Sequence, residues 1–234
     1  MALQALQRSI APNTQNWMLD RVQVGELEEH VHNSKVWTTG IYKKAVTDAI
    51  VVTRFGLEGD QHTGAEPDPD RAVCCHPLGH YNFWRSYFRR DIPVGFFGEN
   101  LTISGVLDED LCVGDVIRCG TTWLQVTQPR TPCYKQANKL GVPNFVKLIE
   151  QTGKLGFLMR VLEPGVIQMG DAFELIERPC PQVSLPFVNR KMYDHKDIDT
   201  ARELANLDVL AQYWRDKFAE HVTKAKGTFS TDSV

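Results

Sequence analysis

Short runs of apolar and alternating residues fill most of the first three quarters of the chain, and Gly, Asp and Pro separate them. Runs of this kind are typical of strands in a sandwich or a barrel. The pattern therefore predicts a mainly β domain at residues 21–178. The expected strands are residues 22–24, 49–54, 100–104, 115–118, 122–127 and 173–176.

Two segments inside this region have helical periodicity instead. Apolar residues recur three and four positions apart within residues 80–90 and within residues 144–151. This spacing places them on one face of a helix. Stripes of this kind usually pack into the core, so neither requires a bound cofactor. The stripes consist of Tyr81, Trp84, Tyr87 and Phe88, and of Phe145, Leu148 and Ile149.

The pattern changes after Arg178. Pro179 and Pro181 interrupt the chain there, which indicates a domain boundary. Beyond it, residues 197–206 and residues 207–223 have the periodicity of short amphipathic helices.

Three parts are therefore expected: a loosely structured leader at residues 1–20, the β domain at residues 21–178, and a small helical region at residues 179–234. A region of this size buries little apolar surface by itself. Its helices should pack on the main domain, on each other or on a partner subunit, so a homodimer is one expected arrangement.

Charge and composition exclude several classes of partner. The chain has 26 Lys and Arg against 29 Asp and Glu, a formal net charge of −3, so no overall field attracts it to nucleic acid or to an anionic membrane. Its apolar runs are far shorter than the roughly 20 residues of a membrane-spanning helix. The N-terminus lacks the pattern of a secretory signal. A cytoplasmic location is expected.

The six cysteines form no Cys-x-x-Cys pair. In a cytoplasmic protein of this size most of them are expected to be small buried residues rather than a disulfide framework. A zinc site at Cys74, Cys75 and His76 is disfavoured, because alternation along a strand directs Cys75 to the face opposite the other two. The cysteines are Cys74, Cys75, Cys112, Cys119, Cys133 and Cys180.

One cysteine lies in a segment suited to chemistry. The sequence Gln-Pro-Arg-Thr-Pro-Cys-Tyr-Lys at residues 128–135 contains two prolines, which predict a stiff loop rather than a strand or helix. Arg130 and Lys135 flank Cys133, and nearby positive charge favours the thiolate that acts as a nucleophile or metal ligand. A buried structural cysteine beside two surface cations is the alternative.

This segment resembles the cysteine loop of the MOSC family, named for the C-terminal domain of molybdenum-cofactor sulfurases, and especially its YiiM-like branch of hydroxylaminopurine-resistance proteins. Other motifs of that branch occur in the same order, and the resemblance covers residues 50–178. The helical tail resembles the small three-helix region of that branch. The motifs are Gly56-Leu57-Glu58-Gly59-Asp60, Asp70-Arg71-Ala72-Val73 with His80-Tyr81 and Trp84, Phe97-Gly98-Glu99-Asn100-Leu101, Val113-Gly114-Asp115, and Gly153-Lys154-Leu155-Gly156-Phe157.

The resemblance implies a MOSC-type β-barrel with peripheral helices that binds the molybdenum cofactor, molybdopterin. It implies that Cys133 is a thiolate ligand of molybdenum. It also implies reduction of N-hydroxylated compounds such as hydroxylaminopurine-type bases. The chain contains no recognisable flavin, haem or iron–sulfur motif, so the electrons are expected to come from a separate reductase.

Physical chemistry suggests roles for the residues around Cys133. Arg130, Lys135 and Arg71 can pair with the phosphate of molybdopterin. Asn100 can donate and accept hydrogen bonds at the cofactor, and Asp60 is placed with this cofactor-binding group.

Reduction of an N–O bond also consumes two protons. Glu99 can accept from the pterin or transfer a proton, and His62 and His80 are candidate proton donors. Each of these residues also has a purely structural interpretation, as a surface charge, a turn residue or a core histidine.

The chain departs from the family at one place. YiiM-like proteins usually have His-Gly-Gly before the Asp-Arg-Ala-Val motif, whereas residues 66–69 here read Glu-Pro-Asp-Pro. His62 is the expected substitute. The departure favours a second hypothesis, a non-catalytic carrier or sensor of the cofactor or its sulfur. A metal-free cysteine-dependent transferase is the third hypothesis.

Overall fold

All six strands expected from the hydrophobic pattern are present. In β5, for example, Ile50 is 8% exposed and Val51 is 42% exposed, so neighbouring side chains face the core and the surface in turn. The six strands are β1 (Met18–Val24), β5 (Ile50–Thr53), β8 (Leu101–Ser104), β9 (Val116–Cys119), β10 (Thr122–Pro129) and β13 (Phe173–Glu177).

The computed structural model describes residues 16–32, 35–61 and 67–228, and seven more strands lie within these ranges. All five residues of β7 are buried, so this strand is covered on both faces and has no alternation by which it could be predicted. The seven strands are β2 (Glu28–His32), β3 (Lys35–Thr39), β4 (Lys44–Val46), β6 (Gly56–Leu57), β7 (Val73–Pro77), β11 (Phe157–Glu163) and β12 (Gly165–Ile167).

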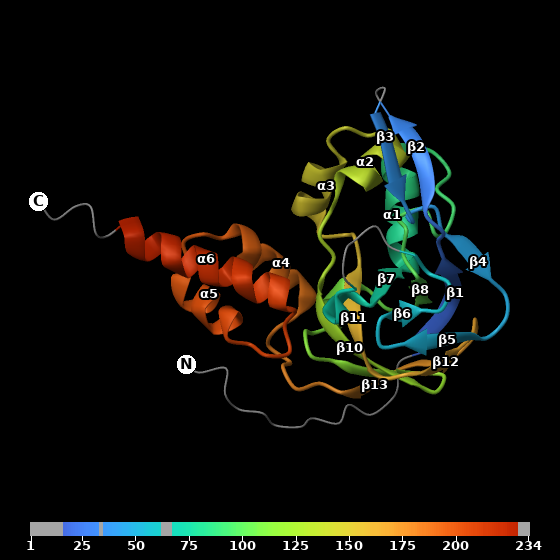
Figure 1. Cartoon of the computed structure of the whole chain (residues 1–234). Helices are drawn as coiled ribbons and strands as arrows, with labels where there is room; N and C mark the ends of the chain where they lie inside the picture. Colours follow the sequence, from blue (N-terminus) through green and yellow to red (C-terminus); the bar gives the residue numbers. More distant parts are fainter. Residues whose placement is uncertain (1–15, 33–34, 62–66, 229–234) are drawn as a thin grey trace, which may run out of the picture.

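Eight of the strands form the central sheet, in the order β13-β9-β10-β11-β7-β8-β1-β4 (Figure 1). The start of β1 approaches the start of β13 through an isolated bridge between Met18 and Ala172 and a 2.9 Å hydrogen bond from Leu19 N to Asp171 O. No closed barrel is found among the described residues, so the expected β-barrel is not confirmed. The fold is mixed α+β, with this large sheet and six α-helices in the described ranges.

Three helices gather at one end of the sheet around a second, aromatic core (Figure 1). Trp84 and Phe97 both contact Phe145, with ring centroids 5.5 Å and 5.9 Å apart. Tyr87 is 53% exposed, so its expected place in the buried stripe was wrong. The helices are α1 (Leu78–Phe88), α2 (Tyr134–Leu140) and α3 (Phe145–Thr152).

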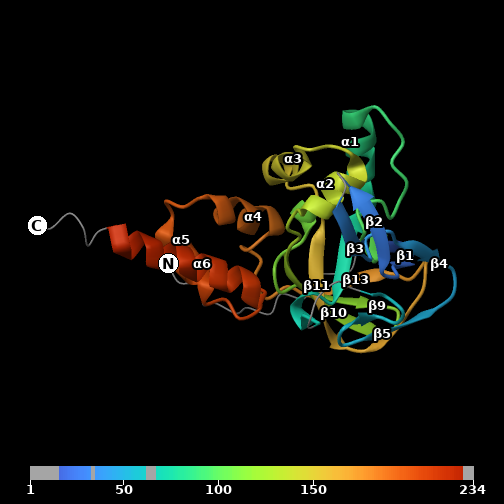
Figure 2. The same ribbon diagram turned by 45° about the horizontal axis from the view of Figure 1, so that its top comes forward.

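The other three helices, α4 (Leu185–Tyr193), α5 (Ile198–Ala205) and α6 (Gln212–Thr228), extend from one side of the sheet. Figure 2 shows α4 on the same side as α3, and α6 pointing away from the strands. Periodicity predicted no helix at α4, although the resemblance implied three helices in this region. Its start is capped by Ser184, whose hydroxyl accepts a 3.4 Å hydrogen bond from Phe187 N.

These helices pack on the main region. Trp214 and Phe218 are almost fully buried and join its core. Ala211 N donates to Thr127 O (3.1 Å), and Gln212 N donates to Asp70 Oδ2 (2.8 Å). The helical region is thus held by apolar contacts and by hydrogen bonds to β10 and the segment before β7.

The first strand begins earlier than the hydrophobic pattern predicted. β1 begins at Met18, within the expected leader, and residues 1–15 lie outside the described residues. The placement of the domain boundary at residue 178 remains a prediction. No described helix is both long enough and apolar enough to cross a membrane.

Candidate functional site

Cys133 lies at the junction between β10 and α2. The segment 128–135 was expected to be a loop throughout. Instead, its first two residues complete β10 and its last two begin α2. Both prolines lie outside the interior of a helix, so neither interrupts one. Cys133 N donates to Gln136 Oε1 (3.1 Å), and the buried Gln136 donates from Nε2 to Phe97 O (3.3 Å). The thiol is therefore carried on a backbone anchored to the aromatic core.

Cys133 also differs from the other cysteines in exposure. Cys74, Cys75, Cys112, Cys119 and Cys180 are all buried, as expected, whereas Cys133 is partly exposed. Burial raises the pKa of the Cys75 thiol well above its ordinary value and that of Cys119 to about 12. Cys133 is thus the cysteine that combines access with a fixed position.

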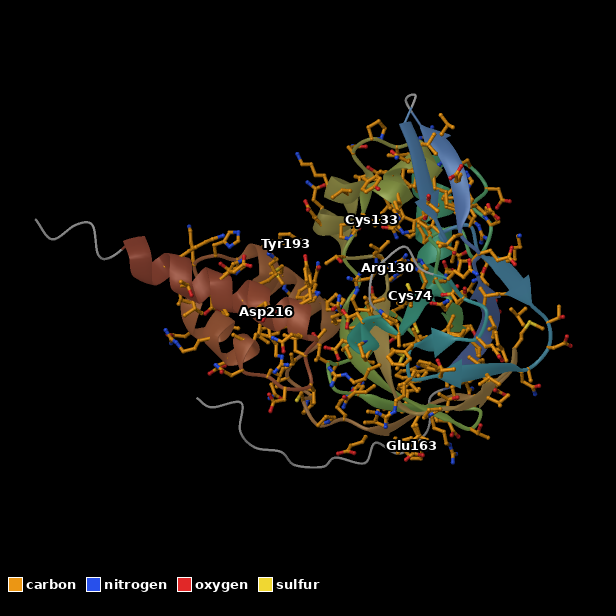
Figure 3. The ribbon with its side chains drawn as sticks, viewed as in Figure 1. Cys74, Arg130, Cys133, Glu163, Tyr193 and Asp216 are labelled. Carbon is orange, nitrogen blue, oxygen red and sulfur yellow. The ribbon has the colours of Figure 1, made fainter. Side chains whose placement is uncertain are left out.

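Arg130 occupies the short connection before Cys133. Its backbone N donates to Gly156 O (2.9 Å), and Gly156 has a φ of +88° with only 2.1 Å between an added Cβ and Cys75 O, so a side chain there would clash. Figure 3 shows Arg130 between Cys133 and Cys74 in that view. Burial raises the pKa of Cys74 and Arg130 opposes this shift, which shows that the guanidinium lies near the strand.

Two predicted residues, Asp60 and Asn100, are brought together in a buried network. Asn100 Nδ2 donates to Asp60 Oδ2 (2.8 Å), and Asn100 Oδ1 accepts from Cys74 N (3.1 Å). Asp60 Oδ1 forms a salt bridge with Lys43, whose side chain is 3% exposed, and accepts from Gly25 N (2.7 Å). These contacts tie the segment before β7 to β1 and β8.

Glu99 is fully buried beside this network. Its Oε1 accepts hydrogen bonds from Tyr81 (2.5 Å), Thr102 (2.9 Å) and Gly95 N (3.1 Å). Burial, followed by the charge of Glu99, raises the pKa of the Tyr81 hydroxyl far above its ordinary value. Glu99 Oε2 is buried with no hydrogen-bond partner among the described residues.

Lys139 is a residue that the sequence analysis missed. Its ammonium donates to Ile41 O (3.0 Å) and lies 4.7 Å from the ring centroid of Tyr42. Burial lowers the pKa of Lys139 to about 8; Glu99 opposes the shift, and the positive charges of Arg130 and Lys43 add to it. Its position one helical turn after Lys135 was the only signal in the sequence.

The hairpin of β2 and β3 covers the start of α2 (Figure 1). Trp37 and Tyr134 have ring centroids 6.3 Å apart, and Lys135 Nζ donates to Thr38 O (3.2 Å). Lys135 is therefore held against the hairpin. Together these residues give the neighbourhood of Cys133 an aromatic side.

The three remaining predicted residues are Arg71, His80 and His62. Arg71 is exposed at the end of a short 3₁₀ helix, Pro69–Arg71. His80 lies beside Asp108 in the wall of a separate cavity. His62 lies outside the described residues.

Comparisons with known proteins identify the family of this chain. The MOSC domain family matches residues 58–174. The uncharacterized protein YflK of Bacillus subtilis (strain 168) is 37% identical over 84% of this chain and 90% of YflK. A protein named "Reductase" from Gibberella moniliformis (strain M3125 / FGSC 7600) is 32% identical over 77% of this chain, but this covers 33% of that protein.

A solved structure supports membership of the same family. The crystal structure of YiiM from Geobacillus stearothermophilus superposes with a TM-score of 0.75 and 32% identity, over 88% of this chain and 99% of YiiM. The chain belongs to the MOSC domain family, and YiiM proteins are among its relatives.

Proposed function

We propose that this protein binds the molybdenum cofactor through Cys133 and is an oxidoreductase that reduces N-hydroxylated compounds with electrons from a separate reductase. The observation that carries the proposal is the position of Cys133, a partly exposed thiol on an anchored strand-to-helix junction, while the other five cysteines are buried. Membership of the MOSC family and the relative named "Reductase" support it.

The residues around Cys133 fit such a cofactor chemically. A thiolate is a suitable ligand for a soft transition metal. Arg130 Nη1 is buried with no hydrogen-bond partner in the described ranges, so the guanidinium can still bind an anion such as the cofactor phosphate. Glu99 Oε2 is a second buried atom without a described partner and can accept from an amine group.

Each of these residues has a separate role in the proposal. When bound, the molybdenum centre supplies the two electrons for cleavage of the N–O bond. Cys133 holds the metal and Arg130 binds the anionic part of the cofactor. Lys139 replaces His80 as our candidate proton donor, because with a pKa of about 8 its ammonium is mostly protonated at neutral pH and can release a proton.

Metal analysis tests the proposal directly. The protein is produced in a host that makes the cofactor, and molybdenum per chain is measured for the wild type, Cys133→Ser and the control Cys180→Ser, whose thiol is buried. We expect molybdenum in the wild type and the control, and loss of it in Cys133→Ser. Equal molybdenum in all three samples, or none in any of them, would contradict the proposal.

A non-catalytic carrier or sensor of the cofactor is a second candidate, favoured by the sequence Glu-Pro-Asp-Pro at residues 66–69, where YiiM-like proteins usually have His-Gly-Gly. It predicts retained molybdenum without reduction of hydroxylamino compounds by any electron donor. A metal-free cysteine-dependent transferase is the third candidate. It predicts rapid alkylation of Cys133 at neutral pH in protein that binds no molybdenum.

A further inference from the structure

A cavity of about 730 Å³ lies between the main region and the helical region. His80 of α1, Asp108 and Lys154 line it from the main region, and Asn189 and Tyr193 line it from α4. Cys133 is not part of its wall. Pro129, the last residue of β10, is the point at which the cavity adjoins the connection to Cys133.

Two buried polar side chains in the cavity wall lack partners. His80 is 1% exposed and Asp108 is 6% exposed. Within the described part of the chain, both ring nitrogens of His80 and Oδ1 of Asp108 have no hydrogen-bond partner, and His80 Nε2 is 4.0 Å from Asp108 Oδ2. Buried polar groups are normally satisfied, so this pair requires an explanation.

Neither member of the pair is expected to be charged at neutral pH. Burial raises the pKa of Asp108 to about 8, although a hydrogen bond from the Gly156 backbone opposes the shift. Burial, with smaller contributions from His76 and Lys154, lowers the pKa of His80 to about 2. The protonated carboxyl group is a hydrogen-bond donor, and the neutral imidazole offers one donor and one acceptor.

The charges around the pair are balanced. The charged groups that act on Asp108 are Glu109 on its own 3₁₀ helix and Lys154 after α3, and Arg190 on α4 lines the same cavity. Lys147, Glu150 and Asp194 complete the charged lining, so the cavity carries three cations and three anions besides Asp108. Its wall does not select a ligand by net charge.

We propose that this cavity is a second ligand site, which takes a small uncharged molecule with an amide or lactam group, the carbonyl accepting from Asp108 and the N–H pairing with His80. An amide presents an acceptor and a donor side by side, which matches the unsatisfied atoms of His80 and Asp108. A carboxylate ligand would be repelled when Asp108 ionises, and an ammonium ligand would require that ionisation. The site is independent of the cofactor proposed at Cys133.

Three molecules of the same size and different charge test the ligand class: nicotinamide, nicotinate and 3-(aminomethyl)pyridine. Binding to the full chain is measured by saturation-transfer NMR titration between pH 6 and pH 9.5. At pH 7 we expect nicotinamide to bind more tightly than the other two molecules. Its affinity should fall up to about tenfold for each pH unit above about 8, because Asp108 loses its proton. Preference for either charged molecule, or no binding of nicotinamide, overturns the proposal.

Two variants locate the binding. Asp108→Asn keeps a donor without a titrating proton, so it should retain nicotinamide binding and lose the pH dependence. Asn189→Trp places an indole in the cavity from α4 and should weaken binding at least tenfold, with the fold checked by circular dichroism. Unchanged binding in a folded Asn189→Trp variant would show that nicotinamide binds elsewhere and would overturn the proposal.

Discussion

Two pairs of a basic and an acidic side chain that the structure describes differ in how well their polar groups are satisfied. Lys43 and Asp60 form a direct salt bridge, and Asn100 and Gly25 donate further hydrogen bonds to the carboxylate. In the separate cavity, His80 and Asp108 are 4.0 Å apart and lack such support.

The difference shows that hydrogen bonding determines whether a buried group is stable in its charged form. A buried ion pair is stable when its remaining acceptors and donors are satisfied, whereas groups without that support keep the neutral form. The first pair is a satisfied ion pair that stabilises the fold. The second leaves hydrogen-bonding capacity free for a ligand.

The largest expected effect comes from removing one partner of the well-satisfied pair. Asp60→Asn leaves Lys43 as an uncompensated buried charge and should reduce the free energy of unfolding by about 3–5 kcal/mol. Urea unfolding at pH 7 measures it. Asp108→Asn is the matched variant at the other pair and should not reduce the free energy of unfolding at pH 7, because it replaces a carboxyl group that is mostly uncharged at that pH. Equal losses would remove the distinction between the pairs.

The next effect concerns proton transfer near the first pair. Lys139→Gln should reduce the rate at which hydroxylamino compounds are reduced about 100-fold, because a loss in this range is expected when a general acid is removed. In the wild type the rate should fall above pH 8, because the donor must be protonated. Lys139→Arg should restore part of the rate and move the fall to higher pH, and Lys217→Gln on α6 is the surface control. A wild-type profile without a fall near pH 8 would eliminate Lys139 as the donor.

Stability against pH gives a third test, at the second pair. The folded pKa of Asp108 is about 8 and its ordinary value is 3.8, so the folded state holds a proton that the unfolded state has lost. Its contribution to stability is complete below pH 3.8 and declines as the pH rises to about 8.

Between these limits, Asp108→Asn should gain up to about 1.4 kcal/mol per pH unit relative to the wild type. His80 acts in the opposite sense below its ordinary pKa of 6.5, and the comparison of the two proteins removes its contribution if His80 is unchanged. Parallel stability curves for the variant and the wild type would show that Asp108 is not buried in its neutral form.

The smallest effect concerns cofactor binding. Arg130→Ala should lower the molybdenum content of protein purified at limiting cofactor about tenfold, because one charge-assisted contact is lost. Arg71→Ala should lower it less, since Arg71 is exposed and has no described contact with the Cys133 segment. The reverse order would transfer the phosphate-binding role to Arg71.

Part of the fold was predictable because its signal is local. Strands such as β5 alternate between core and surface, and α1 has a stripe that includes the buried Tyr81 and Trp84. β7 was not predicted, because it is buried on both faces and shows no alternation. The helix α2 was not predicted either, because two prolines precede it and it has seven residues.

The candidate site could also be predicted only in part. Cys133, Arg130, Asp60, Asn100 and Glu99 lie in motifs that a reader of the sequence can recognise. Lys43 lies far from them along the chain, and it meets Asp60 only after β1, β8 and the segment before β7 have assembled. Lys139 had one weak signal in the sequence, its position one helical turn after Lys135.

The sequence by itself determined the family, the main strands, the burial of most cysteines and the choice of Cys133, because each depends on residue types at short spacing. Only the tertiary structure decided that Lys139 has a lowered pKa, that Lys43 pairs with Asp60, and that His80 lies with Asp108 in a separate cavity. Burial and long-range contacts set these properties, and both arise when distant segments pack together.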